Sequence, residues 1–340
     1  MRIAVVQAAY ELMDRAATLD RTVHLIGEAA QGGAGLIAFP EVFIPGTPIW
    51  IDSAPIWEGD AQWYALLCDQ AVVIPGPVTD AIGAAARAAG VYVVIGVDER
   101  EPHGATIFNT TCYFGPDGAL LARHRKLVPT GSERTVWGMG DGSTLPVVDT
   151  PFGRVSGLTC WENYMPLVRF HLYAQGVDLW IAPTLAGGDA WIATMRHIAR
   201  EGRCYVVGVN PCLRADQIPA TFPDRERVWR RDRPDGDWVE PGNSVIVDPN
   251  GAVLAGPSRH EETILWADLD PAEVRAARRF FDPAGHYHRP DIFQLTVDTR
   301  PRPAVTVIGP GSGSLVPAPA RHSRGDRDQP TGDGAPTTGT

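Results

Sequence analysis

An α/β domain built from stacked layers is the fold class that the sequence predicts. Short apolar runs alternate with helical patterns along most of the 340 residues, and other apolar runs are separated only by hairpin turns. Mixed strands that carry helices on their outer faces are typical of layered α/β folds. Hydrophobic residues make up 44% of the chain, so a chain of this length can bury one large core or two modest ones.

The first hundred residues show strands separated by helices. A buried strand is a short, nearly continuous apolar run, whereas a helix repeats its apolar residues at three- and four-residue intervals. The segment from Asp20 to Gln31 places Val23, Ile26 and Ala30 on one helical face. In chain order, the patterns predict strands at 2–7, 35–39 and 91–97 and helices at 20–31 and 80–89.

The next part of the chain contains hairpins, and after them helices and strands alternate again. Gly-Pro-Asp-Gly at 115–118, Thr-Pro-Phe-Gly at 150–153 and Asp-Pro-Asn-Gly at 248–251 are hairpin signals. The segment 213–240 carries many charges and prolines, so we expect a long loop there. The expected strands are 110–114, 120–125, 147–149, 154–159, 179–183, 205–210 and 263–269, and the expected helices are 167–174, 191–203 and 271–281.

The last forty residues differ in composition from the rest. Glycine and proline together supply 14 of these 40 residues, and no Phe, Trp or Tyr follows residue 300. Such a segment buries too little apolar surface to offset the entropy lost on ordering. We therefore expect residues 1–300 to form the folded domain and residues 301–340 to form a disordered tail.

Charge and composition disfavour several classes of protein. With 30 basic and 40 acidic residues the net charge is -10, which argues against binding to nucleic acid. The N-terminus turns polar too soon for a secretory signal, and there is no apolar run of about eighteen residues to predict a membrane span. The five cysteines are scattered and form no C-x-x-C pair, so we expect a reducing, cytoplasmic location without disulfides or a zinc site.

Three predicted strands lead into a reactive polar residue, namely Glu41, Lys126 and Cys160. Sites in α/β proteins are built at strand ends, because polar tips converge there while the core stays apolar. The gaps between the three, 126 − 41 = 85 and 160 − 126 = 34 residues, are too long for a local motif. Any convergence of these side chains must therefore be tertiary.

Each of these residues also has an ordinary structural interpretation. A lone cysteine is most often buried and inert, and a lone charged residue is most often solvated. Cys160, however, follows a strand and precedes a helical stretch, where helix-terminal amides and a nearby cation would favour its thiolate. Glu41 lies inside an apolar run, where a carboxylate needs a partner or a function. Lys126 in its basic run, and Glu133 beside Arg134, fit a solvated surface equally well.

At these positions the sequence resembles the nitrilase superfamily, and in particular its nitrilase branch. The motif ending at Glu41 reads Phe-Pro-Glu, the one containing Lys126 reads His-Arg-Lys-Leu-Val-Pro-Thr, and the one containing Cys160 reads Leu-Thr-Cys-Trp-Glu-Asn. One departure is Thr47, where relatives often carry an aromatic residue, and it bears on substrate preference. The matching blocks run in the family's order over about residues 1–295, at 39–41, 124–142, 158–163, 197–204, 241–244 and 285–291.

The resemblance implies a four-layer α-β-β-α sandwich and a catalytic set of Glu41, Lys126 and Cys160, with Glu133 as a fourth member. It implies no metal and no organic cofactor. Cys160 would attack a small-molecule nitrile to give a covalent thioimidate and then a thioester, so that a carboxylic acid and ammonia are released. Family members form dimers that extend into larger rings or spirals, so we expect a homo-oligomer with contacts from 263–281.

Substrate positioning has three candidates: Trp161 and Glu162, which follow the cysteine directly, and Trp191, a tryptophan in a predicted helix that could line the pocket. Trp161, directly after the cysteine, favours the nitrile-hydrolysing branch over the amide-hydrolysing one. Glu162, two residues after Cys160, suits a supporting hydrogen-bonding role better than a catalytic one.

Several alternatives remain open at this stage. An amidase or carbamoylase of the same superfamily, a cyanide-hydrolysing enzyme and an inactive scaffold would all share these motifs. Cys160 with His197 could form a Cys-His-Asn hydrolase. His286 and His288 could ligate a metal, although two ligands at i and i+2 are a poor spacing without further ones.

Overall fold

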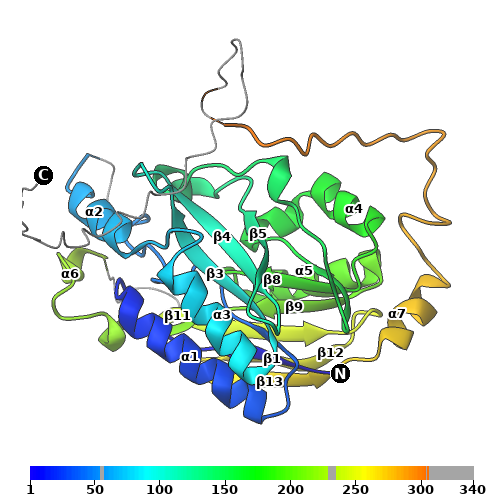
Figure 1. Ribbon diagram of the computed structural model, residues 1–340, viewed down its shortest axis with the longest axis horizontal. Helices are drawn as coiled ribbons and strands as arrows, with labels where there is room; N and C mark the ends of the chain where they lie inside the picture. Colours follow the sequence, from blue (N-terminus) through cyan, green and yellow to red (C-terminus); the bar gives the residue numbers. More distant parts are fainter. Residues whose placement is uncertain (54–56, 229–234, 304, 306–340) are drawn as a thin grey trace, which may run out of the picture. The chain divides into compact units, whose positions relative to one another are not determined.

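The computed structural model describes residues 1–53, 57–228, 235–303 and 305 (Figure 1). The chain divides into a unit Met1–Pro301, whose architecture follows, and the segment Arg302–Thr340. The predicted disordered tail, 301–340, lies outside the described residues except for four positions. Within the described part of the chain, no helix has the length and apolar character needed to cross a bilayer.

The first of two sheets places two of the predicted site residues at one edge. Its strands β1, β2 and β3 run parallel, β4 is antiparallel to β3, and β5 is antiparallel to β4. The carboxyl ends of β2 and β5 therefore lie at the same edge, where Glu41 and Lys126 follow them. The sheet has the order β13-β1-β2-β3-β4-β5, with β1 (Arg2–Gln7), β2 (Leu36–Ala38), β3 (Tyr92–Arg100), β4 (Ile107–Phe114), β5 (Leu120–Arg125) and β13 (Thr263–Asp268).

The second sheet carries the cysteine. Its central strands β7, β8 and β9 run parallel, and Cys160 follows the carboxyl end of β7. The order is β10-β11-β9-β8-β7-β6 with β12 paired to β11, and the strands are β6 (Val148–Thr150), β7 (Gly153–Ser156), β8 (Leu179–Pro183), β9 (Tyr205–Val209), β10 (Cys212–Arg214), β11 (Trp238–Val247) and β12 (Val253–Arg259).

Successive side chains along each strand point to opposite faces of the sheet, so they pack into two different apolar clusters. In β1, Ile3 and Val5 belong to the apolar cluster between the two sheets, together with Val207 of β9. The intervening Ala4 and Val6 point the other way, into the cluster that the helices α1 and α3 cover. Figure 1 shows these two helices on the outer side of the first sheet. The helices are α1 (Arg15–Gln31), α2 (Ala61–Gln70), α3 (Pro77–Ala89), α4 (Pro166–Ala174), α5 (Gly188–Gly202), α6 (Arg225–Val228) and α7 (Pro271–Arg278).

The outer face of the second sheet is covered by α4 and α5. Leu172 of α4 and Met195 and Ile198 of α5 are fully buried in one cluster with Trp180 of β8. The sequence of layers is thus helices, sheet, sheet, helices, which confirms the predicted α-β-β-α sandwich.

One prediction about secondary structure was wrong, and one helix was missed. The segment 213–240 is not one long loop, because it includes most of β10, the short helix α6 and the start of β11. Helix α2 was not expected. Its sequence has only a short apolar stripe, in which Trp63 and Leu67 one turn apart are its buried residues, and this signal is too brief to stand out in the sequence.

Candidate active site

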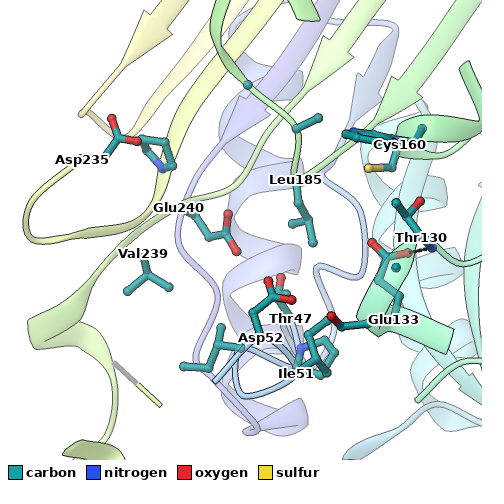
Figure 2. A pocket seen from close by; sticks show the side chains of 18 of the residues that line it. Thr47, Ile51, Asp52, Thr130, Glu133, Cys160, Leu185, Asp235, Val239 and Glu240 are labelled. Carbon is teal, nitrogen blue, oxygen red and sulfur yellow. Dashed lines mark hydrogen bonds between the residues drawn. The ribbon is translucent and has the colours of Figure 1, made fainter. Parts of the chain in front are cut away.

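A cavity of about 640 Å³ lies beside the three strand ends described above (Figure 2). Cys160 and Glu133 line it together, although one follows the second sheet and the other lies in a loop after the first. The remaining lining residues come from near 47–52, 130–132, 161, 185–188 and 235–241, and from Arg259.

Lys126 joins two carboxylates behind the cavity wall. Its Nζ donates to Glu41 Oε1 at 2.9 Å and to Glu133 Oε2 at 2.7 Å. Lys126 and Glu41 are both fully buried, and Glu133 is 8% exposed. Burial alone lowers the pKa of Lys126, but the negative charges of Glu41 and Glu133 outweigh it and raise that pKa above its ordinary value. The ammonium group is therefore charged at every physiological pH.

Glu41 accepts two further hydrogen bonds. Asn109 Nδ2 on β4 donates to Glu41 Oε1 at 2.7 Å, and the backbone N–H of Leu185 donates to Oε2 at 3.0 Å. The carbonyl of Asn109 also accepts the backbone N–H of Lys126 at 2.8 Å. Asn109 thus fixes both members of the ion pair, and the sequence analysis missed it. The only signal was an asparagine inside a β-branched and aromatic strand, where asparagine is uncommon.

Cys160 begins a short 3-10 helix, η3 (Cys160–Tyr164), in a strained conformation. Its φ of 53° is in the left-handed region, which a side chain with a Cβ adopts at a cost. The turn is fixed by its own sequence: Glu162 Oε2 accepts the backbone N–H of Thr159 at 2.9 Å. Asn163 Nδ2 donates to the carbonyls of Leu158 and Cys160, each at 2.8 Å. The motif therefore holds the sulfur at the cavity wall.

The sulfur of Cys160 and one carboxylate oxygen each of Glu41 and Glu133 lie within 4.8 Å of one another. Burial, followed by the negative charge of Glu41, raises the pKa of the Cys160 thiol to about 12, although Lys126 acts in the opposite direction. The expectation that this position favours a thiolate was therefore wrong. A cation is near, but burial and two carboxylates outweigh it, so the resting group is a neutral thiol.

The protonation state of Cys160 gives a first prediction. Alkylation of Cys160 by a neutral reagent such as iodoacetamide should accelerate steadily from about pH 7 to about pH 10, because the thiolate fraction keeps rising below a pKa of about 12. Mass spectrometry of the Cys160 peptide separates it from the other cysteines. A rate that levels off near neutral pH would show a preformed thiolate and contradict the prediction.

Glu133 lies in the 3-10 helix η1 (Gly131–Thr135), at the point where this turn faces Lys126. Its Oε2 also accepts the backbone N–H of Thr130 at 2.6 Å. Burial, and then the charge of Glu41, raise the pKa of Glu133, while Lys126 lowers it. The shared ammonium therefore offsets the repulsion between the two carboxylates.

The Lys126 ammonium also contacts the ring of Trp137, which Asp98 holds by a hydrogen bond. The Lys126 ammonium lies 5.5 Å from the centre of the Trp137 ring, and Trp137 Nε1 donates to Asp98 Oδ1 at 2.6 Å. Asp98 is fully buried, and burial is the main cause of a pKa well above the ordinary value for an aspartate. The aromatic ring adds an attractive face for the cation.

The candidates for substrate positioning separate into two groups. Trp161 lines the cavity and is 54% exposed. Glu162 does not line it, because its carboxylate bonds the Leu127 N–H at 2.6 Å, the Thr159 N–H and the His124 ring at 2.9 Å. Glu162 therefore joins the cysteine turn to the strand that precedes Lys126. Trp191 is 1% exposed and packs in the cluster beneath α5, away from the cavity lining.

Neither alternative site is assembled by the residues that the structure describes. His197 lies on the exposed side of α5, 3.6 Å from Glu201, and lines a different hollow from Cys160. His286 and His288 join no group of potential metal ligands among the described residues. Glu41, Glu133 and Cys160 do form such a group, but the Lys126 ammonium already bonds both carboxylates, so a second cation there would meet its repulsion.

The known proteins that resemble this chain are carbon-nitrogen hydrolases. A family model described as carbon-nitrogen hydrolase matches residues 2–279. An aliphatic nitrilase of Sinorhizobium fredii (strain HH103) is 46% identical over 309 residues, which cover 89% of this chain and 97% of the relative. A bifunctional nitrilase/nitrile hydratase of Lupinus angustifolius is 42% identical over 90% of this chain and 88% of its own. The crystal structure of Saccharomyces cerevisiae Nit3, a member of branch 10 of the nitrilase superfamily, superposes with a TM-score of 0.64 at 21% identity, covering 85% of this chain and 97% of that chain.

Proposed function

We propose, because this chain belongs to the carbon-nitrogen hydrolase family, that it is a nitrilase, which hydrolyses an organic nitrile to the carboxylic acid and ammonia. The observation that carries the proposal is the thiol of Cys160 at the cavity wall, within reach of the Glu41–Lys126–Glu133 ion cluster. Relatives at 46% and 42% identity that are named as nitrilases support the nitrile as substrate.

Attack on the nitrile begins with a proton transfer. Because the resting Cys160 is a neutral thiol, its proton must leave as the sulfur attacks, and Glu41 is the base that the geometry favours. The sulfur bonds to the nitrile carbon, one C–N π bond becomes a lone pair on nitrogen, and that nitrogen takes the proton that Glu41 received from the thiol. Lys126 is the fixed cation beside the nitrogen that gains charge. The product is a covalent thioimidate.

Two waters complete the reaction. The first adds to the thioimidate carbon, the C–N bond breaks, and ammonia leaves a thioester on Cys160. The second attacks the thioester carbon, which releases the carboxylic acid and returns the thiol. Glu133 and Glu41, which bond the same ammonium, can accept a proton from each attacking water and return it to the leaving ammonia or to the thiolate. Trp161, on the cavity wall, is proposed to contact the substrate.

A second outcome is favoured by the lupin relative, which is named as both a nitrilase and a nitrile hydratase. If the tetrahedral intermediate expels the thiol in place of ammonia, the product is the primary amide. One site can therefore release acid and amide in a ratio that depends on which leaving group is protonated. We propose acid as the main product and amide as the minor one.

The test compares a nitrile with its matched primary amide at equal concentration. We expect faster turnover of the nitrile across several pairs, with acid and ammonia formed in equal amounts, because the relatives favour the nitrile. Ammonia, acid and amide are measured together by enzymatic assay and chromatography. Faster turnover of the amides across the series would instead make this chain an amidase.

We also propose a homo-oligomer, a dispensable segment after residue 300 and a reducing, cytoplasmic location. Exposed apolar side chains near the end of the compact unit, such as Phe280, Ile292 and Phe293, support contacts between copies. All five cysteines are free, which agrees with a reducing compartment. Light scattering on the full chain and on a chain ending at residue 300 tests the first two, since an active monomer would exclude the oligomer and an insoluble truncation would exclude a dispensable tail.

A further inference from the structure

A buried histidine joins the segment that carries Lys126 to the segment that carries Cys160. His124 lies on β5, two residues before Lys126, and its ring contacts Glu162, two residues after Cys160. Both His124 and Glu162 are 1% exposed, and neither is among the residues that line the cavity. The steps of nitrile hydrolysis described above use neither side chain, although the pair connects the strand of the cation to the turn of the nucleophile.

Both ring nitrogens of His124 face hydrogen-bond acceptors. Nδ1 lies 2.6 Å from the carbonyl oxygen of Thr144, and Nε2 lies 2.9 Å from Glu162 Oε2. A carbonyl oxygen can only accept, so Nδ1 must carry a proton. The Glu162 carboxylate acts as an acceptor too, because its Oε1 accepts the Leu127 N–H at 2.6 Å and its Oε2 accepts the Thr159 N–H at 2.9 Å. The contact at Nε2 therefore requires a second proton on the ring.

The charges around His124 also favour the doubly protonated ring. Burial lowers the pKa of His124, and the nearby charge of Lys126 lowers it as well. The charge of Glu162 and the hydrogen bonds to Glu162 and Thr144 outweigh both effects, so the pKa of His124 is raised above its ordinary value. Tyr113 on β4 is the other titratable group influenced by the Glu162 charge, and burial raises the pKa of Tyr113 so far that it stays neutral.

We infer that His124 is a positioning residue for the proposed reaction, and that as a buried imidazolium it holds the turn of Cys160 against the strand of Lys126. The pair spans the two sheets, because β5 belongs to the first and the turn of Cys160 follows β7 of the second. A neutral His124 would point a lone pair at the Glu162 carboxylate, and the repulsion would weaken the two backbone hydrogen bonds that this carboxylate accepts. The inference deepens the proposed nitrile hydrolysis, and its kinetic part rests on that function.

Solid-state NMR of the full chain with ¹⁵N-labelled histidine measures the charge of the ring without any substrate. Protonated and unprotonated imidazole nitrogens differ in their ¹⁵N chemical shifts, and the His124 signals are those that disappear in His124→Gln. At about pH 7, which is above the ordinary pKa of a histidine, both nitrogens of His124 should be protonated. A ring that is protonated on Nδ1 alone would place the shared proton on Glu162 and refute the inference.

Two replacements of His124 separate its charge from its shape. His124→Gln keeps a neutral N–H donor on the side of Glu162, whereas His124→Asn is too short to reach that carboxylate. We expect kcat for the nitrile to fall about 100-fold in His124→Asn and about tenfold in His124→Gln, because both catalytic groups shift slightly. KM should stay near its wild-type value, since His124 lies outside the cavity lining. His197→Gln, which removes an exposed histidine 3.6 Å from Glu201, is the control and should keep wild-type kinetics.

The pH dependence of stability tests the sign of the charge. A histidine whose pKa is raised in the folded state adds stability below its unfolded pKa, and this stability is lost as pH rises through the folded-state pKa. The difference in Tm between wild type and His124→Asn should therefore be larger at about pH 6 than at about pH 9. A difference that is the same at both pH values would show a packing role only and contradict the inference.

The outcomes separate the positioning role from the reaction. If wild type releases no ammonia from any nitrile, the proposed function fails and the positioning role fails with it, whatever the charge of the ring. If nitriles are hydrolysed and both His124 variants keep the wild-type kcat, the proposed function stands and the positioning role is refuted. Should either variant fail to fold, the protonation of His124 in the wild-type NMR spectrum decides the inference.

Discussion

Replacing Cys160 with alanine is expected to remove nitrile turnover, by about four orders of magnitude or more in kcat, and to leave the fold intact. The loss is large because Cys160 is the one thiol among the described residues that line the cavity, and its sulfur lies with the Glu41 and Glu133 carboxylates. The fold should survive because alanine removes a single sulfur from a side chain that stands at the edge of a cavity. The measurement is ammonia release from purified protein, with thermal unfolding recorded in parallel.

Two other cysteines provide matched controls for Cys160→Ala. Cys204 and Cys212 are fully buried and free, as a cysteine in a core is, and neither lines the cavity. Their alanine variants lose similar packing, so each should keep its activity even where it unfolds at a lower temperature. Wild-type turnover in Cys160→Ala would falsify the proposed mechanism, and lost turnover in a well-folded Cys204→Ala would show that the assay reports packing.

The sequence could predict the fold and the strand ends because both depend on local patterns. Apolar runs followed by a polar residue placed Glu41 after β2, Lys126 after β5 and Cys160 after β7, and the hairpin signals placed the turns beside them. The pairing of strands could not be obtained from those patterns. That β2 and β5 end at one edge follows from two successive antiparallel pairings, which bring residues 85 positions apart (126 − 41) to 2.9 Å.

The contacts that position the catalytic candidates and set their pKa values could not be predicted from the sequence. Asn109 holds Glu41 only because β4 starts at the same edge where β2 ends. Glu162 was expected near the cysteine, but its bond to His124 depends on how the two sheets stack. The thiol pKa of Cys160 is set by burial and two carboxylates, and burial is a property of the whole fold, so the sign of the shift needed coordinates.

Replacing Lys126 with methionine is the prediction with the largest expected effect on stability as well as on activity. Methionine keeps the length and apolar stem that pack over Trp137 but removes the charge, which leaves Glu41 and Glu133 buried without their shared cation. Breaking a buried ion pair in this way costs about 3–5 kcal/mol in the free energy of unfolding. Turnover should be lost too, because no cation then faces the nitrile nitrogen.

The pH dependence of Lys126→Met distinguishes lost charge from lost packing. Burial and the charge of Glu41 already raise the pKa of Glu133 in the native chain, and Lys126 lowers that pKa. Removing Lys126 therefore raises the pKa of Glu133 further. A carboxyl whose folded-state pKa lies above its unfolded value adds stability at low pH and loses it as pH rises through the folded-state pKa. The variant should therefore melt closer to wild type at about pH 5 than at about pH 8.

Lys126→Met combined with Glu133→Gln removes one of the two repelling charges, so it should recover stability at pH 8 but not turnover. If the single variant melts like wild type at both pH values, the two carboxylates do not depend on Lys126, and the cluster has another source of stability.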